Sequence, residues 1–426
     1  MIPRYRVKTV MLAGGERLPM LVDSAGQPLF EPTVFVLTEL RARNRASNTI
    51  GNALQALMVF HLFLDLRRID LDSRLAAGQL LALAEVDDLV RVCRYPVGRL
   101  TGMFDEAIEK PHLPASSLEK NRVRQGLSTD VDIVPASVAT RLRYIRDYLV
   151  WHADRRLSME RVGSEVRSAL ESARQFMVKA INARLPSGKS HGLLGRREGL
   201  ESGVVARMLK VTNPHSPENP WVDEHSRYRN ELIISWLHRL GIRRGELLGI
   251  RISNIDFRKG TVVVARNADD PNDPRRYQPK AKTLGREIPL SSGLIDKTYA
   301  YIMNHRVNLP GASKHEFLFV ASDSGAPLSI PSLAKIFNVL RAKCPEMPRD
   351  LSPHVLRHTW NDAYSEEMDK RKIPEEQEKK TRAFLMGWSE TSGSAATYTR
   401  RHIRRKAHNA SLKMQSQLMN GAKADE

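Results

Sequence analysis

The sequence predicts a mainly α-helical protein with a small β-sheet, an α+β fold in at least two domains. Its 426 residues are enough for two or three domains with separate cores. Long segments place apolar residues at three- and four-residue steps, which is the spacing of an amphipathic helix. Two short runs in the second half, Thr261–Ala265 and Arg286–Leu290, have the composition of strands and predict the small sheet.

Residues 1–29 are predicted to form a β-hairpin. Residues 5–12 supply the first strand, Gly14 and Gly15 the turn, and Leu18–Val22 the second strand. The hairpin is either a separate arm that reaches a binding partner or a simple edge ribbon. The sequence leaves both interpretations open.

Residues 30–184 are predicted to form a helical domain. Helical spacing of apolar residues is clear in Thr49–Leu66, Ser137–Leu157 and Ser164–Ala183, and Ser164 is the predicted N-cap of the third segment. The second segment also carries Arg141, Arg143 and Arg146. A basic helix face of this kind can lie along phosphates, or it can simply be a solvated surface.

Residues 185–199 are predicted to be a linker, because they are rich in Gly, Ser and basic residues. Gly188, Lys189 and Ser190 match the end of a phosphate-binding loop. However, Ala183 stands where that loop needs its first glycine, and no predicted strand precedes it. The sequence therefore argues against an ATP site here.

Residues 200–426 are predicted to form a second, mostly helical domain. It begins with a helix over Glu201–Val211, followed by a helix over Asn230–Leu240 that ends at Gly241. The two predicted strands come next, and helices then continue to a tail helix over Ala407–Met419.

The charge balance predicts a polyanionic partner. The chain has 67 Lys and Arg against 48 Asp and Glu, a net charge of +19, and a pI near 10.0. The basic residues do not form one amphipathic helix with a bulky apolar face, so nucleic acid is favoured over a membrane surface. Two distant cysteines, Cys93 and Cys344, and the absence of a signal-like N-terminus favour a cytoplasmic protein without disulfides.

Two arginines in the second domain have the chemistry needed at a phosphodiester. Arg243 follows Gly241 at the start of a helix predicted over Glu246–Arg251, and Arg357 follows His354 by one helical turn. A guanidinium is planar, always charged and able to donate two parallel hydrogen bonds to phosphate oxygens. A histidine beside it can transfer protons near neutral pH.

His354 and His358 are four residues apart on a predicted helix, a spacing that could bind zinc. Arg357 lies between them and would repel a cation, and the glutamate of zinc-peptidase motifs is missing. No metal and no cofactor are therefore predicted, and His358 is predicted to be structural.

Tyr398 is the candidate nucleophile. It stands among small and polar residues, and Arg400 and Arg401 follow it without an apolar stripe that would bury the ring. A phenol with a pKa near 10 attacks phosphorus only when cations or a base help to remove its proton. Arginines and a histidine nearby would provide that help.

These residues together resemble the phage integrase, or tyrosine recombinase, family over roughly residues 200–410. The motifs that carry the resemblance occur in the family's order: Gly-x-Arg-x-x-Glu-Leu at Arg243 and Glu246, His-x-x-Arg at His354 and Arg357, Leu385–Trp388, and Tyr398. Each motif is short, and their order and spacing make the match specific.

Two positions depart from the pattern or leave a choice. Trp388 stands where the family usually has histidine; an indole N–H can donate to a phosphate oxygen but cannot carry a proton. The family's lysine precedes a strand that resembles Arg286–Leu290, and both Lys280 and Lys282 are candidates, with the register favouring Lys280 slightly.

The resemblance implies an enzyme that cleaves and rejoins duplex DNA at specific sites through a 3′-phosphotyrosine intermediate. It implies the following roles: Tyr398 as nucleophile, Arg243 and Arg357 on the non-bridging oxygens, Lys280 or Lys282 as the acid for the leaving 5′-oxygen, His354 in proton movement, Glu246 in orienting its neighbours, and Trp388 in supporting the phosphate. Bond energy is kept in the covalent intermediate, so neither ATP nor a metal is required.

The resemblance also implies how the chain meets DNA. Residues 30–184 would be a core-binding domain, 200–426 the catalytic domain, and duplex DNA the partner, with Arg141, Arg143, Arg146, Arg400 and Arg401 as expected contacts. Exchange between two duplexes implies a homotetramer on DNA, with an accessory recombinase or a DNA-bending protein as a possible further partner. The tail helix would pack either on a neighbouring subunit or on its own domain.

Two other functions fit the same residues. A type IB topoisomerase would use a similar pocket to relax supercoils as a monomer, although the length and motif spacing suit an integrase better. A non-catalytic DNA-binding regulator of this fold is the other, and the complete set of Arg243, His354, Arg357 and Tyr398 argues against it.

Overall fold

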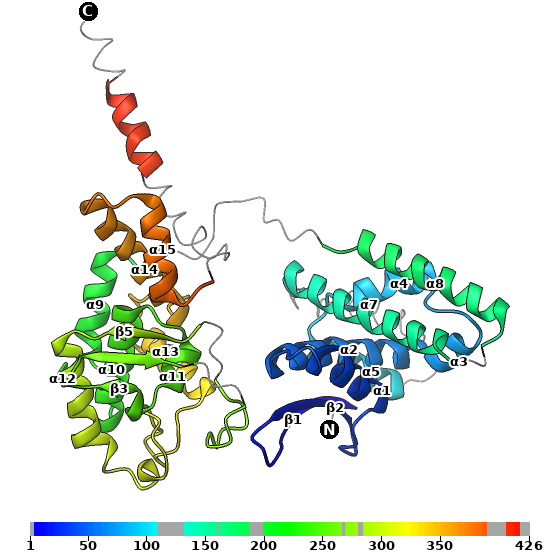
Figure 1. Cartoon of the computed structure of the whole chain (residues 1–426), viewed down its shortest axis with the longest axis horizontal. Helices are drawn as coiled ribbons and strands as arrows, with labels where there is room; N and C mark the ends of the chain where they lie inside the picture. The colour runs from blue at the N-terminus through cyan, green and yellow to red at the C-terminus, as the bar shows by residue number, and fades with distance from the viewer. Residues whose placement is uncertain are drawn as a thin grey trace, which may run out of the picture. The chain divides into compact units, whose positions relative to one another are not determined.

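The computed structural model describes residues 4–109, 132–159, 162–186, 199–265, 269–279, 284–389 and 406–417. The chain divides into two compact units, Met1–Leu193 and Leu194–Glu426, each with its own hydrophobic core. Figure 1 shows helices as the main element of both units, with one small sheet in each. The predicted α+β class, mainly helical with little sheet, is confirmed.

The N-terminal unit begins with the predicted hairpin. Strands β1 (Tyr5–Met11) and β2 (Arg17–Asp23) pair antiparallel, with Val7 opposite Leu21. Leu21 is fully buried, and both strands pack against helix α2 (Ser47–Arg67). The hairpin therefore contributes side chains to the core of its unit.

Helix α2 is the centre of the N-terminal unit. Its side chains are buried on nearly all sides, and it contacts α4, α5 and α7 as well as the hairpin. Among the described residues it is the one helix long and apolar enough to cross a membrane, but 61% of its apolar window lies inside the unit. The other elements are α1 (Phe30–Phe35), a π-helix (Val36–Arg41), α3 (Leu71–Ala76), α4 (Leu83–Val92), α5 (Val97–Glu109), α7 (Pro135–Leu157) and α8 (Ser164–Ala183).

The C-terminal unit places a three-stranded antiparallel sheet among helices. The strand order is β3-β4-β5, and Val262 of β4 pairs with Ile288 of β5. The first elements of this unit are α9 (Ser202–Thr212), α10 (Glu224–Leu240), α11 (Arg244–Gly249), a 3₁₀ turn (Ile252–Asn254), β3 (Ile255–Asp256), β4 (Thr261–Val264) and β5 (Arg286–Pro289).

The rest of this unit is helical. Helix α10 packs against α14 (Pro353–Lys370) and also contacts α12 (Ser292–Tyr301). The elements are α12 (Ser292–Tyr301), a π-helix (Ile302–Arg306), a 3₁₀ turn (Ala312–Lys314), α13 (Ile330–Lys343), α14 (Pro353–Lys370) and α15 (Glu375–Met386), followed by helical residues 406–417. Every residue of 406–417 is exposed.

Three predicted boundaries are wrong in detail. Gly163, not Ser164, is the N-cap of α8, and it makes no side-chain capping bond. Helix α10 begins at Glu224 rather than Asn230, because the Asp223 carboxylate caps it by accepting from the Ser226 amide at 2.8 Å. The helix after Gly241 runs over Arg244–Gly249 instead of Glu246–Arg251.

Both cysteines are buried, one in each unit. Burial raises the pKa of the Cys93 thiol to about 12 and also raises the pKa of the Cys344 thiol. Thiols in this condition stay protonated and unreactive at neutral pH.

Two histidines, His152 buried and His61 partly buried, share an aromatic cluster in the N-terminal unit. The ring of Tyr148 lies 4.5 Å from the ring of His152, edge-on, and 6.2 Å from the ring of His61. Burial lowers the pKa of each histidine to about 4, and the charge of His61 adds to this effect at His152. In the unfolded chain the histidine pKa values are near 6.5. Between about pH 4 and pH 6.5 the unfolded chain therefore binds more protons than the folded unit.

Acidification should therefore destabilise the N-terminal unit as the pH falls from about 6.5 towards 4. We expect a loss of about 2 kcal/mol per histidine between pH 7.5 and pH 5. His152→Phe, which keeps an aromatic ring but cannot titrate, should reduce this loss by about that amount. Urea unfolding of the 426-residue chain, followed by circular dichroism at both pH values, measures the difference. An equal loss in the variant and the wild type would contradict the assignment.

Candidate active site

A left-handed glycine and a short helix fix the position of Arg243. Helix α10 ends at Gly241, whose φ of +59° favours glycine, and a Cβ there would meet the Trp360 ring at 2.8 Å. Arg243 is the N-cap of α11, and its backbone amide donates to Glu246 Oε2 at 3.0 Å. The first motif is thus a sharp turn locked by its own glutamate.

Glu246 is a buried carboxylate held between two arginines. Its side chain has no exposed area, and Oε2 also accepts from Arg286 Nη2 at 2.9 Å. Arg243 Nη1 lies 3.4 Å from Oε1. Arg286, itself only 2% exposed, donates through Nε to the Leu385 carbonyl at 2.6 Å. The first motif and strand β5 therefore meet at one carboxylate, and Arg286 links both to helix α15.

Arg357 approaches the same turn from α14. It is 1% exposed, and its Nη1 donates to the carbonyl of Gly241 at 2.6 Å. Its guanidinium carbon lies 5.5 Å from the centre of the Trp388 ring. This bond attaches the His-x-x-Arg motif to the first motif, because Gly241 is two residues before Arg243.

His354 lies one turn before Arg357 on α14 and is exposed. Its Nε2 is 3.2 Å from Nε2 of His358, and the two rings meet edge-on. Among the described residues, no group of three or more His, Cys, Asp or Glu side chains has the arrangement of a metal site.

Trp388 is placed by the end of α15. Gly387 ends the helix with φ +63°, and the Trp388 amide donates to the Ala383 carbonyl at 2.9 Å. The indole is 7% exposed and packs with Met386 and Trp360. The Gly387 carbonyl accepts from the Leu284 amide at 3.1 Å, which attaches this turn to the segment before β5.

The structure thus brings together Arg243, Glu246, Arg357 and Trp388, with His354 on the helix of Arg357. Five predicted site residues lie outside the described residues: Lys280, Lys282, Tyr398, Arg400 and Arg401.

Arg286 is the residue that sequence reasoning missed. The sequence predicts only that Arg286 lies in a strand, yet its side chain connects Glu246 with Leu385. A signal was present, because Arg286 and Ile288 occupy the buried positions of the alternating strand. An arginine at an inward position requires a buried acceptor.

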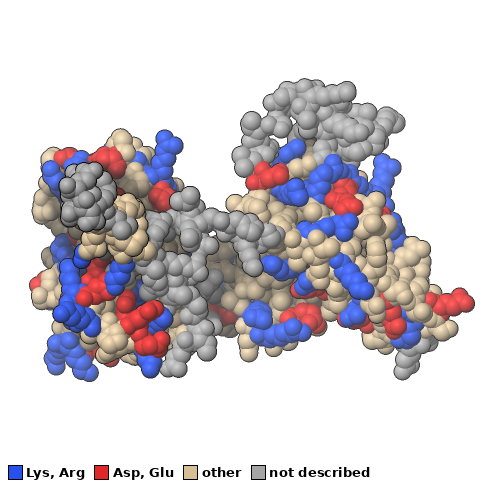
Figure 2. All heavy atoms as spheres, turned by 90° about the horizontal axis from the view of Figure 1, so that it is seen from above, with Lys and Arg blue, Asp and Glu red and all other residues tan. Residues whose placement is uncertain are grey.

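The predicted DNA-contacting arginines of α7 have different surroundings. Arg141 Nη1 donates to the carbonyls of Cys93 and Tyr95, at 3.0 and 2.7 Å. Arg146 pairs with Asp147 and donates to Asn182. Arg143 is exposed. In Figure 2, basic side chains on the visible face are interspersed with acidic ones.

The order of these motifs decides the family. The profile of the phage integrase family matches residues 200–401, a range that contains all four motifs. The C-terminal unit belongs to the phage integrase family. Curated relatives of this family include the tyrosine recombinase XerD of Halalkalibacterium halodurans, 27% identical over 132 residues, and that of Staphylococcus aureus, 26% identical over 143 residues.

These alignments cover 31% and 34% of the chain, and 39% and 43% of the two relatives. The chain therefore spans about two fifths of the length of the curated relatives that it matches. Among solved structures, XerH bound to its difH substrate is similar over 87% of this chain and 90% of XerH, with 14% identity and a TM-score of 0.46. The Tn1549 transposon integrase in complex with a circular intermediate DNA is similar over 71% of this chain and 97% of its own, with 15% identity and a TM-score of 0.36.

The buried Glu246–Arg286 pair predicts a strong energetic coupling in the integrase domain. Glu246→Ala leaves the Arg286 guanidinium buried with one fewer acceptor, and we expect a loss of about 3 kcal/mol in the free energy of unfolding. The double variant Glu246→Ala/Arg286→Met should lose less than the sum of the two single variants. Urea unfolding of the four proteins measures the coupling energy, and strict additivity would contradict it.

Proposed function

We propose that this protein is a site-specific DNA recombinase that breaks and rejoins duplex DNA through a 3′-phosphotyrosine intermediate. The observation that carries the proposal is the bond from Arg357 to the Gly241 carbonyl, which attaches one motif arginine to the turn that bears the other. Membership of the C-terminal unit in the phage integrase family supports the same reaction. The curated relatives carry the name tyrosine recombinase.

In the proposed reaction, the Tyr398 phenolic oxygen forms a bond to the scissile phosphorus, and the bond from phosphorus to the 5′-oxygen breaks. The phenolic proton leaves with help from His354, and Lys280 or Lys282 gives a proton to the departing 5′-oxygen. Attack by a 5′-hydroxyl of a partner duplex reverses the step. One phosphoester bond replaces another, so the reaction needs no external energy source.

Two arginines stabilise the charge that develops on the non-bridging oxygens. Arg243 and Arg357 are held before the substrate arrives, the first by the Glu246 cap and the second by the Gly241 carbonyl. Fixed donors cost little reorganisation in the transition state. Trp388, packed beside Arg357, supports the phosphate from the end of α15.

The partners follow from this chemistry. Two duplexes, each cut on both strands, require four active sites, so we infer a homotetramer on duplex DNA, with an accessory recombinase or a bending protein as a further partner. The exposed helix 406–417, with Leu412 and Met414 on its surface, is available to pack on a neighbouring subunit or on its own unit. A cytoplasmic location fits a DNA-acting enzyme.

Tyr398→Phe should abolish the covalent protein–DNA adduct on a nicked suicide duplex that carries the cleavage site, because phenylalanine has no nucleophilic oxygen. Denaturing gel electrophoresis of labelled DNA detects the adduct. Tyr299→Phe, at an exposed position of α12, is the matched control and should form adduct like the wild type. Equal adduct with Tyr398→Phe would refute the nucleophile.

Substitutions of the α7 arginines should distinguish residues that contact DNA from residues that stabilise the fold. Arg143→Ala should weaken DNA binding and lower the salt slope by about one unit, since one exposed cation is lost. Arg141→Ala should mainly lower stability, because its guanidinium bonds two carbonyls. Fluorescence anisotropy titrations at several salt concentrations, with unfolding curves, test this. An unchanged salt slope for Arg143→Ala would exclude the contact.

A further inference from the structure

The loop that leads towards the two lysines is anchored although it has no regular structure. Residues 269–279 form neither helix nor strand, yet the side chains of Asp273 and Arg275 are only 1% and 8% exposed, and Gln278 and Pro279 are buried. Loops of this kind usually lie on the surface. A loop with four buried side chains immediately before Lys280 therefore needs an explanation.

Arg275 provides most of the anchoring. Its Nε and Nη2 bind the two oxygens of Asp273, at 2.9 and 2.8 Å, in a bidentate pair. Its Nη1 donates to the Leu248 carbonyl at 3.0 Å and to the Leu328 carbonyl at 2.9 Å. Leu248 belongs to α11, the helix that starts after Arg243. The loop is therefore bonded directly to the helix of the first motif.

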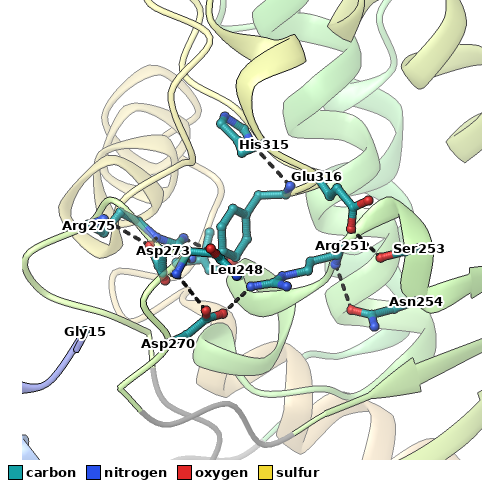
Figure 3. A network of polar contacts seen from close by, with 12 residues as sticks. Gly15, Leu248, Arg251, Ser253, Asn254, Asp270, Asp273, Arg275, His315 and Glu316 are labelled. Atoms are coloured by element: carbon teal, nitrogen blue, oxygen red, sulfur yellow. Dashed lines mark hydrogen bonds and ion pairs between the residues drawn. The ribbon is translucent and has the colours of Figure 1, made fainter. Parts of the chain in front are cut away.

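A second arginine strengthens this network, which Figure 3 shows from close by. The guanidinium carbons of Arg275 and Arg251 lie 4.4 and 5.1 Å from the centre of the Phe317 ring, and Arg251 forms an ion pair with Asp270. Two arginines and two aspartates thus balance their charges around one aromatic ring. Both aspartates belong to the loop, so the network fixes it at two positions.

The opposite end of the lysine segment is anchored to the same helix. The Leu284 amide donates to the Gly387 carbonyl, and Arg286 binds Glu246 of α11. Only residues 280–283 separate the two anchors, so the Cα atoms of Pro279 and Leu284 are at most about 18 Å apart. Residues 280–283 are therefore flanked in the sequence, on both sides, by residues that are hydrogen-bonded to α11.

We propose that Arg275 is a positioning residue for the general-acid lysine, and that with Arg286 it sets the lysine segment in register with Arg243. This inference rests on the proposed recombinase function. It adds a role for a residue outside the family motifs that acts through the loop and not on the DNA. A lysine acid must reach the leaving 5′-oxygen within hydrogen-bond distance, and a freed loop end would lose that placement.

The test replaces the leaving oxygen. In a suicide duplex with sulfur at the bridging 5′ position, the leaving thiolate is stable without a proton, so the general acid is not needed. With ordinary DNA, Arg275→Met should slow adduct formation by about 100-fold, the contribution of a positioned acid. With the sulfur-substituted duplex its rate should lie within about threefold of the wild type.

The matched control is Arg229→Met. Arg229 is a buried arginine of α10 that also donates to a backbone carbonyl, that of Val320, but it lies outside the loop. Its variant should show the same ratio of rates on the two substrates as the wild type. Equal slowing of Arg275→Met on both substrates would overturn the positioning role. A wild type that forms no adduct on either duplex would instead refute the proposed function.

Hydrogen exchange gives a second readout that needs no DNA. In Arg275→Met, peptides within residues 269–286 should exchange at least about tenfold faster than in the wild type, while peptides of α14 should be unchanged. Unchanged exchange in residues 269–286 would show that Arg275 does not hold the loop. This result would count against the inference and leave the tyrosine chemistry untouched.

Discussion

The geometry of the C-terminal unit depends on the hydrogen bonds that the buried carboxylate of Glu246 accepts. Removing an anion from water costs several kcal/mol, and the group persists only where donors replace its hydration. Here the Arg243 amide and the guanidinium groups of Arg243 and Arg286 do so, and they come from the residue before α11 and from strand β5. Since Arg286 also binds the Leu385 carbonyl, the ends of three distant segments are placed by one acid.

Part of the positive charge of this chain is used inside the fold. Arg357, Arg286 and Arg275 each donate to backbone carbonyls at segment ends, and Arg306 does the same at Phe317, Ala312 and His315. Such carbonyls have no partner in a helix or sheet ladder, and an arginine can satisfy several at once. The net charge of +19 therefore overstates the number of cations that can face a phosphate backbone.

Local patterns predicted the helices well, and long-range partners explain what they missed. Thr49–Leu66 came within two residues of α2, because apolar spacing and burial agree there. The start of α10 was missed because His225 and Arg229 look like loop residues, but Tyr301 and Ser322 bind them in the fold. At the site, the motifs predicted Arg243, Glu246, Arg357 and Trp388. Arg275 has no local signature, and Arg286 has only its inward position in the strand, because the partners of both arginines become apparent only once Leu248 and Glu246 are brought near.

The burial of both cysteine thiols has a practical consequence for experiments that follow the association of subunits. The chain has two cysteines, and each is enclosed and held in its protonated form at neutral pH. A maleimide dye should therefore react almost entirely with a cysteine introduced on the solvent side of residues 406–417, without prior removal of the native ones. Energy transfer between copies labelled in this way would report subunit association in real time on a protein that is otherwise unaltered.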